Sequence, residues 1–108
     1  MLPKKNRTTR KDVGTVFQKG VSFWGKNVGL KFYKSTLKTP PKVSFVVSKK
    51  VEKLANKRNA LKRKGYLAIK SFMHKLPLGF NGVFTLKNKE INTELIKQDV
   101  EKILNKIN

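Results

Sequence analysis

The chain has 108 residues, of which 26 are Lys or Arg and only 6 are Asp or Glu, so its formal net charge is +20. Such an excess of positive charge destabilises a compact state unless a polyanion neutralises it, and nucleic acid offers regularly spaced phosphates for this purpose. The absence of Cys excludes disulfides and thiolate metal sites, and no run approaches the roughly 20 apolar residues of a membrane-spanning helix.

The length is typical of one domain. We therefore expect a single nucleic-acid-binding domain over residues 1–108, with a basic arm at residues 1–8. No apolar run follows the first basic residues, so we expect no signal peptide, and a cytoplasmic location is consistent with the sequence. A hydrophobic fraction of 38% supports one modest core but no deep pocket for a small-molecule substrate.

A short helix is expected directly after the arm. Thr9 is followed three residues later by Asp12, which comes close to a capping-box pattern. Gly20 is placed to end this helix. The apolar residues between them recur at helical spacing and share one face: Val13, Val16 and Phe17.

Three strands are expected next, over residues 21–24, 27–34 and 42–48. In the second, alternation sends Val28, Leu30 and Phe32 to one face, and Lys31 and Tyr33 to the other. In the third, the residues that point to one side are Val43, Phe45 and Val47. Each of these strands therefore has one face suited to a core.

A long helix should cover residues 51–75. Its apolar stripe, predicted to face the core, contains Leu54, Leu61, Gly65, Ala68 and Phe72. The opposite stripe, predicted to face solvent, contains Asn59, Arg63, Tyr66 and Lys70. Because Gly is unfavourable within a helix, its presence on the buried stripe predicts close packing against the sheet.

A fourth strand is expected at residues 82–87, before a final helix capped by Asn92 or Thr93. The apolar stripe of that helix contains Ile96, Val100, Ile103, Leu104 and Ile107, and its acids Glu94, Asp99 and Glu101 are expected on the solvated side. The order α-β-β-β-α-β-α predicts an α/β fold in which helices cover one small sheet.

No catalytic constellation is visible in the sequence. His74 is the only His, and the acids lack the spacing of a metal site or of an acid–base pair. We therefore predict no catalytic residue and no metal ligand set in this chain.

A strongly basic segment extends over residues 49–64, where eight of sixteen residues are Lys or Arg and Glu52 is the only acid. Solvated helix faces usually mix charges, because opposite charges one turn apart stabilise and like charges destabilise. The one-sided charge favours binding to phosphates over mere solubility.

Two aromatic residues are candidates for stacking on unpaired bases. Phe17 belongs to an apolar stripe, so the sequence favours a place in the core at least as strongly as stacking. Tyr33 shares a strand face with Lys31, which favours an exposed ring beside a cation.

Several of these segments together resemble the bacterial ribonuclease P protein family. The segment Arg58-Asn59-Ala60-Leu61-Lys62-Arg63 is similar to the family signature Arg-Asn-Arg-x-Lys-Arg, and Phe45-Val46-Val47-Ser48-Lys49-Lys50 is similar to the strand end before it. Further similar segments are Leu2-Pro3-Lys4-Lys5-Asn6-Arg7, Asp12 to Phe17 with Gly20, and Gly79-Phe80-Asn81-Gly82-Val83-Phe84. The resemblance covers nearly the whole chain.

The resemblance implies an α/β sandwich with a mainly antiparallel four-stranded sheet, three helices and a left-handed β-α-β crossover. It also implies a subunit of an enzyme that removes the 5′ leader of precursor tRNA, in which the catalyst is an RNA that holds Mg²⁺. The residues expected to contact the catalytic RNA are Lys49, Lys50, Lys57, Arg58, Asn59, Lys62, Arg63 and Lys64. Those expected to line a cleft for the leader are Val13, Phe17, Lys31 and Tyr33.

The chain departs from the family pattern at Ala60, where Arg is usual, at Tyr66, and at Val13, where the cleft has an aromatic residue. Two alternatives remain open on composition. One is a small ribosomal or other structural RNA-binding protein. The other is a membrane-surface protein, which would need exposed apolar residues opposite a basic helix face.

Overall fold

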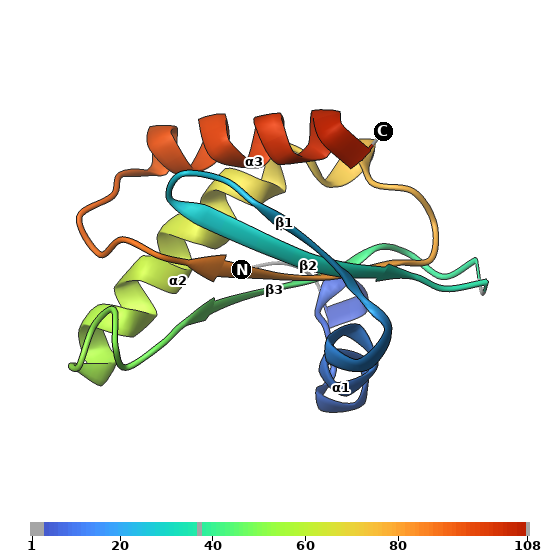
Figure 1. Ribbon diagram of the computed structural model, residues 1–108, viewed down its shortest axis with the longest axis horizontal. Coiled ribbons are helices and arrows are strands. Elements are labelled where there is room, and N and C mark those ends of the chain that lie inside the picture. Colours follow the sequence, from blue (N-terminus) through green and yellow to red (C-terminus); the bar gives the residue numbers. More distant parts are fainter. Residues whose placement is uncertain (1–3, 37, 108) are drawn as a thin grey trace.

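A computed structural model describes residues 4–36 and 38–107 of the protein (Figure 1). The elements follow the predicted order, with two additional short 3₁₀ helices. They are η1 (Lys4–Asn6), α1 (Arg10–Lys19), β1 (Val21–Trp24), β2 (Val28–Lys34), β3 (Lys42–Val47), α2 (Ala55–Lys70), η2 (Met73–Lys75), β4 (Phe80–Leu86) and α3 (Thr93–Ile107). Within this part of the chain, no helix has the length and apolar character needed to cross a membrane.

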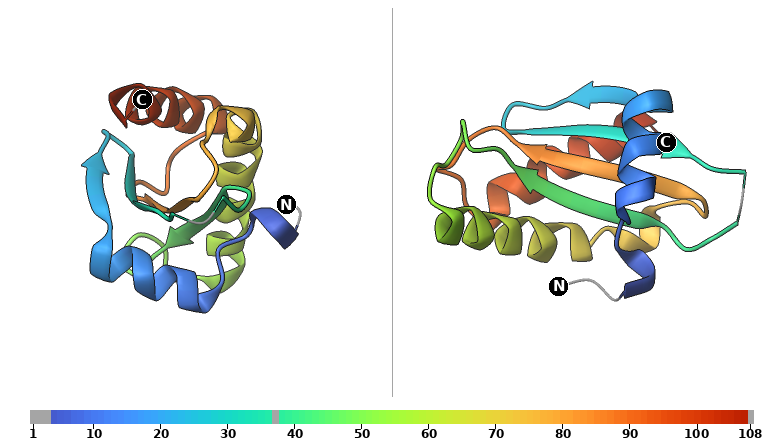
Figure 2. Two further views of the ribbon diagram at one scale, coloured as in Figure 1. Left: turned by 90° about the vertical axis from the view of Figure 1, so that its right-hand side faces the viewer. Right: turned by 90° about the horizontal axis from the view of Figure 1, so that it is seen from below.

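The four strands form one mixed sheet in the order β1-β2-β4-β3. β2 is antiparallel to both β1 and β4, whereas β3 and β4 are parallel neighbours joined through α2. Helices α2 and α3 lie on one face of the sheet, and α1 crosses the other face (Figures 1 and 2). The left-handed sense that the resemblance implies for the β3-α2-β4 connection stays a prediction.

The main core lies between the sheet and the α2–α3 layer. Its centre holds stacked aromatic rings, with the centroids of Phe45 and Phe84 5.1 Å apart. Gly65 of α2 lies directly on this stack, since a Cβ atom there would come within 2.5 Å of Phe45 Cδ1. The predicted close packing of Gly65 is therefore confirmed, and the absence of a side chain lets α2 approach the sheet.

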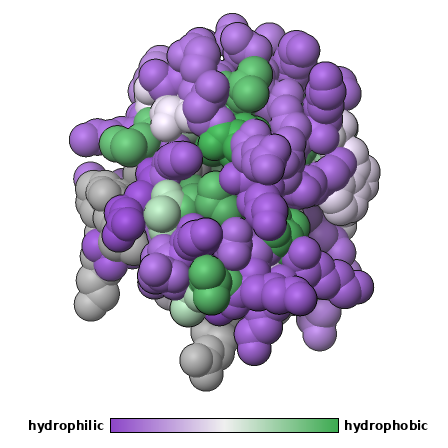
Figure 3. Space-filling view, turned by 90° about the vertical axis from the view of Figure 1, so that its left-hand side faces the viewer, coloured by the Kyte–Doolittle hydropathy of each residue, from purple (hydrophilic) through white to green (hydrophobic). Residues whose placement is uncertain are grey.

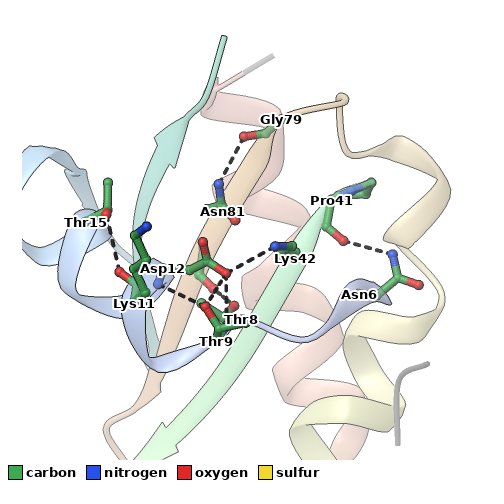
Figure 4. A network of polar contacts seen from close by, with 11 residues as sticks. Asn6, Thr8, Thr9, Lys11, Asp12, Thr15, Pro41, Lys42, Gly79 and Asn81 are labelled. Carbon is green, nitrogen blue, oxygen red and sulfur yellow. Dashed lines mark hydrogen bonds and ion pairs between the residues drawn. The ribbon is translucent and has the colours of Figure 1, made fainter. Parts of the chain in front are cut away.

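The opposite face of the sheet is covered by α1. Val16 of this helix and Val83 of β4 are both fully buried, and α1 contacts β2 and β4. The predicted capping box is confirmed, because Asp12 N–H donates to Thr9 Oγ1 at 3.2 Å and Thr9 N–H donates to Asp12 Oδ2 at 3.1 Å. Lys42 Nζ on β3 also donates to Asp12 Oδ2 at 3.2 Å, which ties the start of α1 to the sheet (Figure 4).

The described part of the basic arm is docked on the sheet. Asn6 Nδ2 donates to the Pro41 carbonyl at 2.8 Å, and Thr8 Oγ1 donates to the Gly82 carbonyl at 3.3 Å (Figure 4). Arg7 forms a parallel bridge with Val43. The arm predicted for residues 1–8 therefore runs along β3 over the residues that the structure describes.

The long helix is shorter than predicted at both ends. Instead of residues 51–75, α2 covers Ala55–Lys70, and a turn leads into η2. Leu54, predicted to be in the core, is 52% exposed because it precedes the first turn of the helix. Helical spacing identified the stripe but did not show where the helix begins.

Two further side chains differ from prediction. Tyr66, expected to face solvent, is half-buried, and its hydroxyl accepts a hydrogen bond from Phe45 N–H at 3.3 Å. Asp99, expected on the solvated side of α3, is only 6% exposed, and its Oδ2 accepts from Asn27 N–H at 2.6 Å. Both polar groups satisfy backbone amides that are distant in the sequence, so charge and polarity alone indicated the wrong surroundings.

Candidate nucleic-acid interface

Basic side chains dominate the surface because the 6 acids of the chain cannot neutralise 26 Lys and Arg residues. The end of the molecule where α2 begins and β4 leads into α3 is largely hydrophilic, with a few hydrophobic residues between (Figure 3). Lys49 and Lys50, predicted to bind RNA, are exposed in the turn after β3, just before α2. This end therefore presents exposed cations to a partner.

One flank of α2 brings together three of the predicted RNA-binding residues. Asn59, Lys62 and Arg63 line a shallow hollow of about 340 Å³ together with Tyr66. Asn59 and Arg63 are exposed, whereas Lys62 is half-buried. We refer to these four residues as the signature flank, since they include three residues of the Arg-Asn-x-x-Lys-Arg motif.

Lys57 and Lys64 belong to the other flank of α2. They line a separate hollow of about 430 Å³ with five residues: Glu52, Ala60, Leu61, Lys89 and Glu90. Lys64 Nζ also donates to the Ile91 carbonyl at 3.5 Å, in the segment before α3. The predicted residues thus form two surfaces, and two acids accompany the lysines on the second.

Arg58 supports the entry to α2. Its Nη1 donates to the carbonyls of Glu52 at 3.0 Å and Lys53 at 2.7 Å, and the side chain is half-buried. This nitrogen therefore fixes the loop before the helix. Part of the role of Arg58 is therefore structural.

The predicted leader cleft has its centre at Phe17 and Lys31. Phe17 is 54% exposed, so the alternative of a core position is wrong. Lys31 Nζ lies 5.3 Å from the centroid of the Phe17 ring, and both residues line a hollow of about 230 Å³ on the α1 side of the sheet. The geometry joins an exposed ring to a cation, which suits an unpaired, charged strand.

The other two predicted cleft residues lie outside this hollow. Tyr33 is half-buried, with Lys19 Nζ 5.9 Å from its ring centroid, and Val13 is half-buried on α1. Residues that sequence reasoning missed complete the lining: Ser22, Trp24, Gly29, Leu30 and Thr85. Strand alternation places Trp24 on the α1 side, but the pairing that brings it to the hollow is not visible in the sequence.

In residues 4–36 and 38–107, no group of three or more His, Asp or Glu side chains is arranged to hold a metal ion. Burial raises the pKa of Asp12, but hydrogen bonds from the Thr9 hydroxyl and amide and from Lys42 outweigh it, so that this pKa is lowered overall. Asp12 is therefore a charged structural group, already paired with a cation.

Known proteins are similar to this chain over nearly its whole length. A family model described as ribonuclease P matches residues 2–108. The chain is 33% identical over 109 residues to the ribonuclease P protein component of Pseudanabaena sp. (strain PCC 6903), covering 98% of this chain and 94% of that protein.

Solved structures share the fold. The RNase P protein of Staphylococcus aureus matches with a TM-score of 0.80 at 19% identity, covering 97% of this chain and 96% of that one. The RNase P protein of Thermotoga maritima matches with a TM-score of 0.79 at 22% identity, covering 94% of this chain and 97% of that one.

Proposed function

The chain belongs to the ribonuclease P protein family, and on this premise we propose how its surfaces serve the enzyme. Members are subunits of the endoribonuclease that processes the 5′ end of tRNA. We propose that the signature flank and the lysines around it bind the catalytic RNA. The hollow at Phe17 and Lys31 binds the 5′ leader of precursor tRNA.

Support for the first assignment comes from the exposed cations of α2. Arg63 is exposed on the signature flank, and a guanidinium can bind phosphate through two parallel hydrogen bonds. Lys49 and Lys50 extend the positive surface beyond the start of α2. The apolar stripe of α2 is used by the core, where Leu61, Ala68 and Ile69 are buried, which disfavours the membrane-surface alternative.

The second assignment rests on one observation, the exposed Phe17 ring with the Lys31 ammonium 5.3 Å from its centroid. Single-stranded nucleic acid binders combine such rings, which stack on bases, with cations that follow the phosphates. Tyr33 and Val13 lie on or beside the same face and would contact the strand outside the hollow. A leader has unpaired bases, whereas a folded RNA surface presents mainly phosphates and sugars.

The placement of the two surfaces lets the catalytic RNA and the precursor tRNA bind to the protein at the same time. α1 and α2 lie on opposite faces of the sheet (Figure 2). The leader hollow is lined by residues of α1, β1, β2 and β4, whereas all residues of the signature flank belong to α2. One rigid domain would thus hold the leader in a fixed position relative to the catalytic RNA. Fixed positioning of reacting groups is itself a large contribution to catalysis.

The cleavage chemistry is assigned to the RNA partner. The described acids offer Mg²⁺ no ligand set, and Asp12 is occupied by Lys42 and Thr9. We therefore expect Mg²⁺ to be held mainly by RNA, and the protein to bind no metal or other cofactor when alone. A cytoplasmic location, where tRNA precursors are processed, is part of the same proposal.

Site-specific crosslinking tests the division of surfaces, because the chain has no Cys and an introduced thiol is unique. Asn59→Cys, carrying a thiol-linked photo-crosslinker, should crosslink to the catalytic RNA. Ser22→Cys, in the hollow, should crosslink to the leader, and Leu95→Cys on α3 serves as an exposed control. Crosslinking of Ser22→Cys to the catalytic RNA alone would refute the assignment of the hollow.

A further inference from the structure

Trp24 is an exposed aromatic residue in the lining of the leader hollow. It is the only Trp in the chain, and 63% of it is exposed at the end of β1. Its partner across the β1–β2 ladder is Gly29. A Cβ atom at Gly29 would lie 2.7 Å from Trp24 Cε3 and Cζ3, so the indole covers the place where a side chain would stand.

Gly29 has a clear consequence for the shape of this surface. Glycine within a strand weakens it and often marks a place where a ligand approaches closely. Here its missing side chain lets the indole of Trp24 lie over the sheet. The pair thus builds an aromatic platform beside the hollow that already contains Phe17.

The dimensions of the hollow limit what it can accept. Its volume of about 230 Å³ is below the roughly 300–1,000 Å³ typical of pockets for larger ligands. Phe17 and Trp24 contribute flat apolar surfaces, while Gly29 and Thr85 come from the neighbouring strands β2 and β4. The space therefore suits one planar group.

The cations beside the hollow indicate that its ligand is negatively charged next to the planar group. Lys31 Nζ lies 5.3 Å from the Phe17 centroid, and Lys87 Nζ lies 5.0 Å from the Trp24 ring centroid. Lys87 Nζ also donates to the Gly25 carbonyl at 3.0 Å, which holds the ammonium beside the indole. The lining contains no acid, so a nucleotide fits both the rings and the cations.

We propose that Trp24 and Phe17 form a subsite for a single unpaired nucleobase of the precursor leader, with its flanking phosphates at Lys31 and Lys87. This inference rests on the proposed function, since it takes the leader as the strand in the hollow. It adds a specific residue pair, Trp24 over Gly29, that decides how firmly one base is held.

Fluorescence gives a direct test, because the emission of Trp24 is the only indole signal. The full-length protein is titrated with a short oligoadenylate and with an abasic oligonucleotide of equal length and charge. Stacking on the indole should make oligoadenylate change the emission strongly, while the abasic strand has little effect. Equal responses to the two strands, or no response to either, would overturn the subsite.

Holoenzyme titrations then separate this inference from the proposed function. Trp24→Ala should weaken binding of leader-bearing precursor by about fivefold or more and leave mature tRNA unchanged. Gly29→Val should act in the same direction, since it keeps the indole but displaces it from the sheet. Leu95→Ala, an exposed apolar residue on α3, should have no effect.

The possible failures have different meanings. If Trp24→Ala binds precursor normally while Phe17→Ala binds it weakly, the subsite is refuted and the leader assignment stands. If neither substitution affects leader-dependent binding, both the subsite and the assignment of the hollow to the leader are refuted. If Trp24→Ala weakens precursor and mature tRNA equally, Trp24 acts outside leader binding and the subsite is refuted.

Discussion

Replacing Phe17 by Ala should reduce leader binding more than it reduces stability. Burial of a whole Phe side chain contributes about 1.5–3 kcal/mol. Because Phe17 is 54% exposed, we expect a loss of only about 1 kcal/mol in the free energy of unfolding. Loss of a stacking platform costs about 1–3 kcal/mol per base, or roughly 5- to 150-fold in affinity for the leader.

Two measurements on the same variant test this reasoning. Urea unfolding of the free protein gives the stability change, and titration of the holoenzyme with precursor and mature tRNA gives the leader-dependent affinity. Val16→Ala is the matched control on α1, since Val16 is fully buried and should lose stability without a specific loss of leader binding. If Phe17→Ala weakens both tRNAs equally, or destabilises as much as Val16→Ala, Phe17 is structural and the cleft assignment is wrong.

Four further substitutions test other parts of the account. Arg63→Ala should leave urea unfolding unchanged but weaken assembly with the catalytic RNA by roughly 1–3 kcal/mol. Arg58→Ala should also lower the free energy of unfolding, because the Arg58 side chain donates to two backbone carbonyls. Equal losses of stability in the two variants would contradict this distinction. Gly65→Ala should lower the free energy of unfolding in urea by about 1–3 kcal/mol, because overpacking against Phe45 exceeds the gain in helix propensity. A variant more stable than the wild type would show that α2 can move away from the sheet. Asp12→Asn should lower the free energy of unfolding at neutral pH, because it weakens the capping box and removes the ion pair with Lys42. The pKa of Asp12 is lower in the folded state than its ordinary 3.8, so its contribution is present above that value and is lost as pH falls through the folded pKa. The stability difference between wild type and Asp12→Asn should therefore shrink in acid, and a difference that grows there would contradict the sign of the shift.

Local patterns predicted much of the fold because they depend on neighbours in the sequence. The Thr9–Asp12 spacing identified the capping box, and the alternation of Val28, Leu30 and Phe32 identified the inner face of β2. β4 was placed at residues 82–87 but covers Phe80–Leu86, because Asn81 and Gly82, residue types that are uncommon in strands, lie inside it. Such boundaries depend on pairing with other strands.

Features that depend on contacts between distant segments were not predictable in the same way. Asp99 was placed in solvent because its partner, the amide of Asn27, is 72 positions away. The basic residues of α2 were treated as one surface, although Lys57 and Lys64 turn toward the loop before α3. Trp24 was missed because only the register of β1 against β2 brings it over Gly29.

Reconstitution of cleavage tests most directly the central claim that this protein assists a catalytic RNA and performs no chemistry itself. The protein is mixed with a bacterial ribonuclease P RNA at low Mg²⁺, and formation of the mature 5′ end of a precursor tRNA is followed with time. We predict that the mixture cleaves faster than the RNA alone, and that the protein alone gives no specific product. Absence of stimulation, or specific cleavage by the nuclease-treated protein without the RNA, would contradict the account.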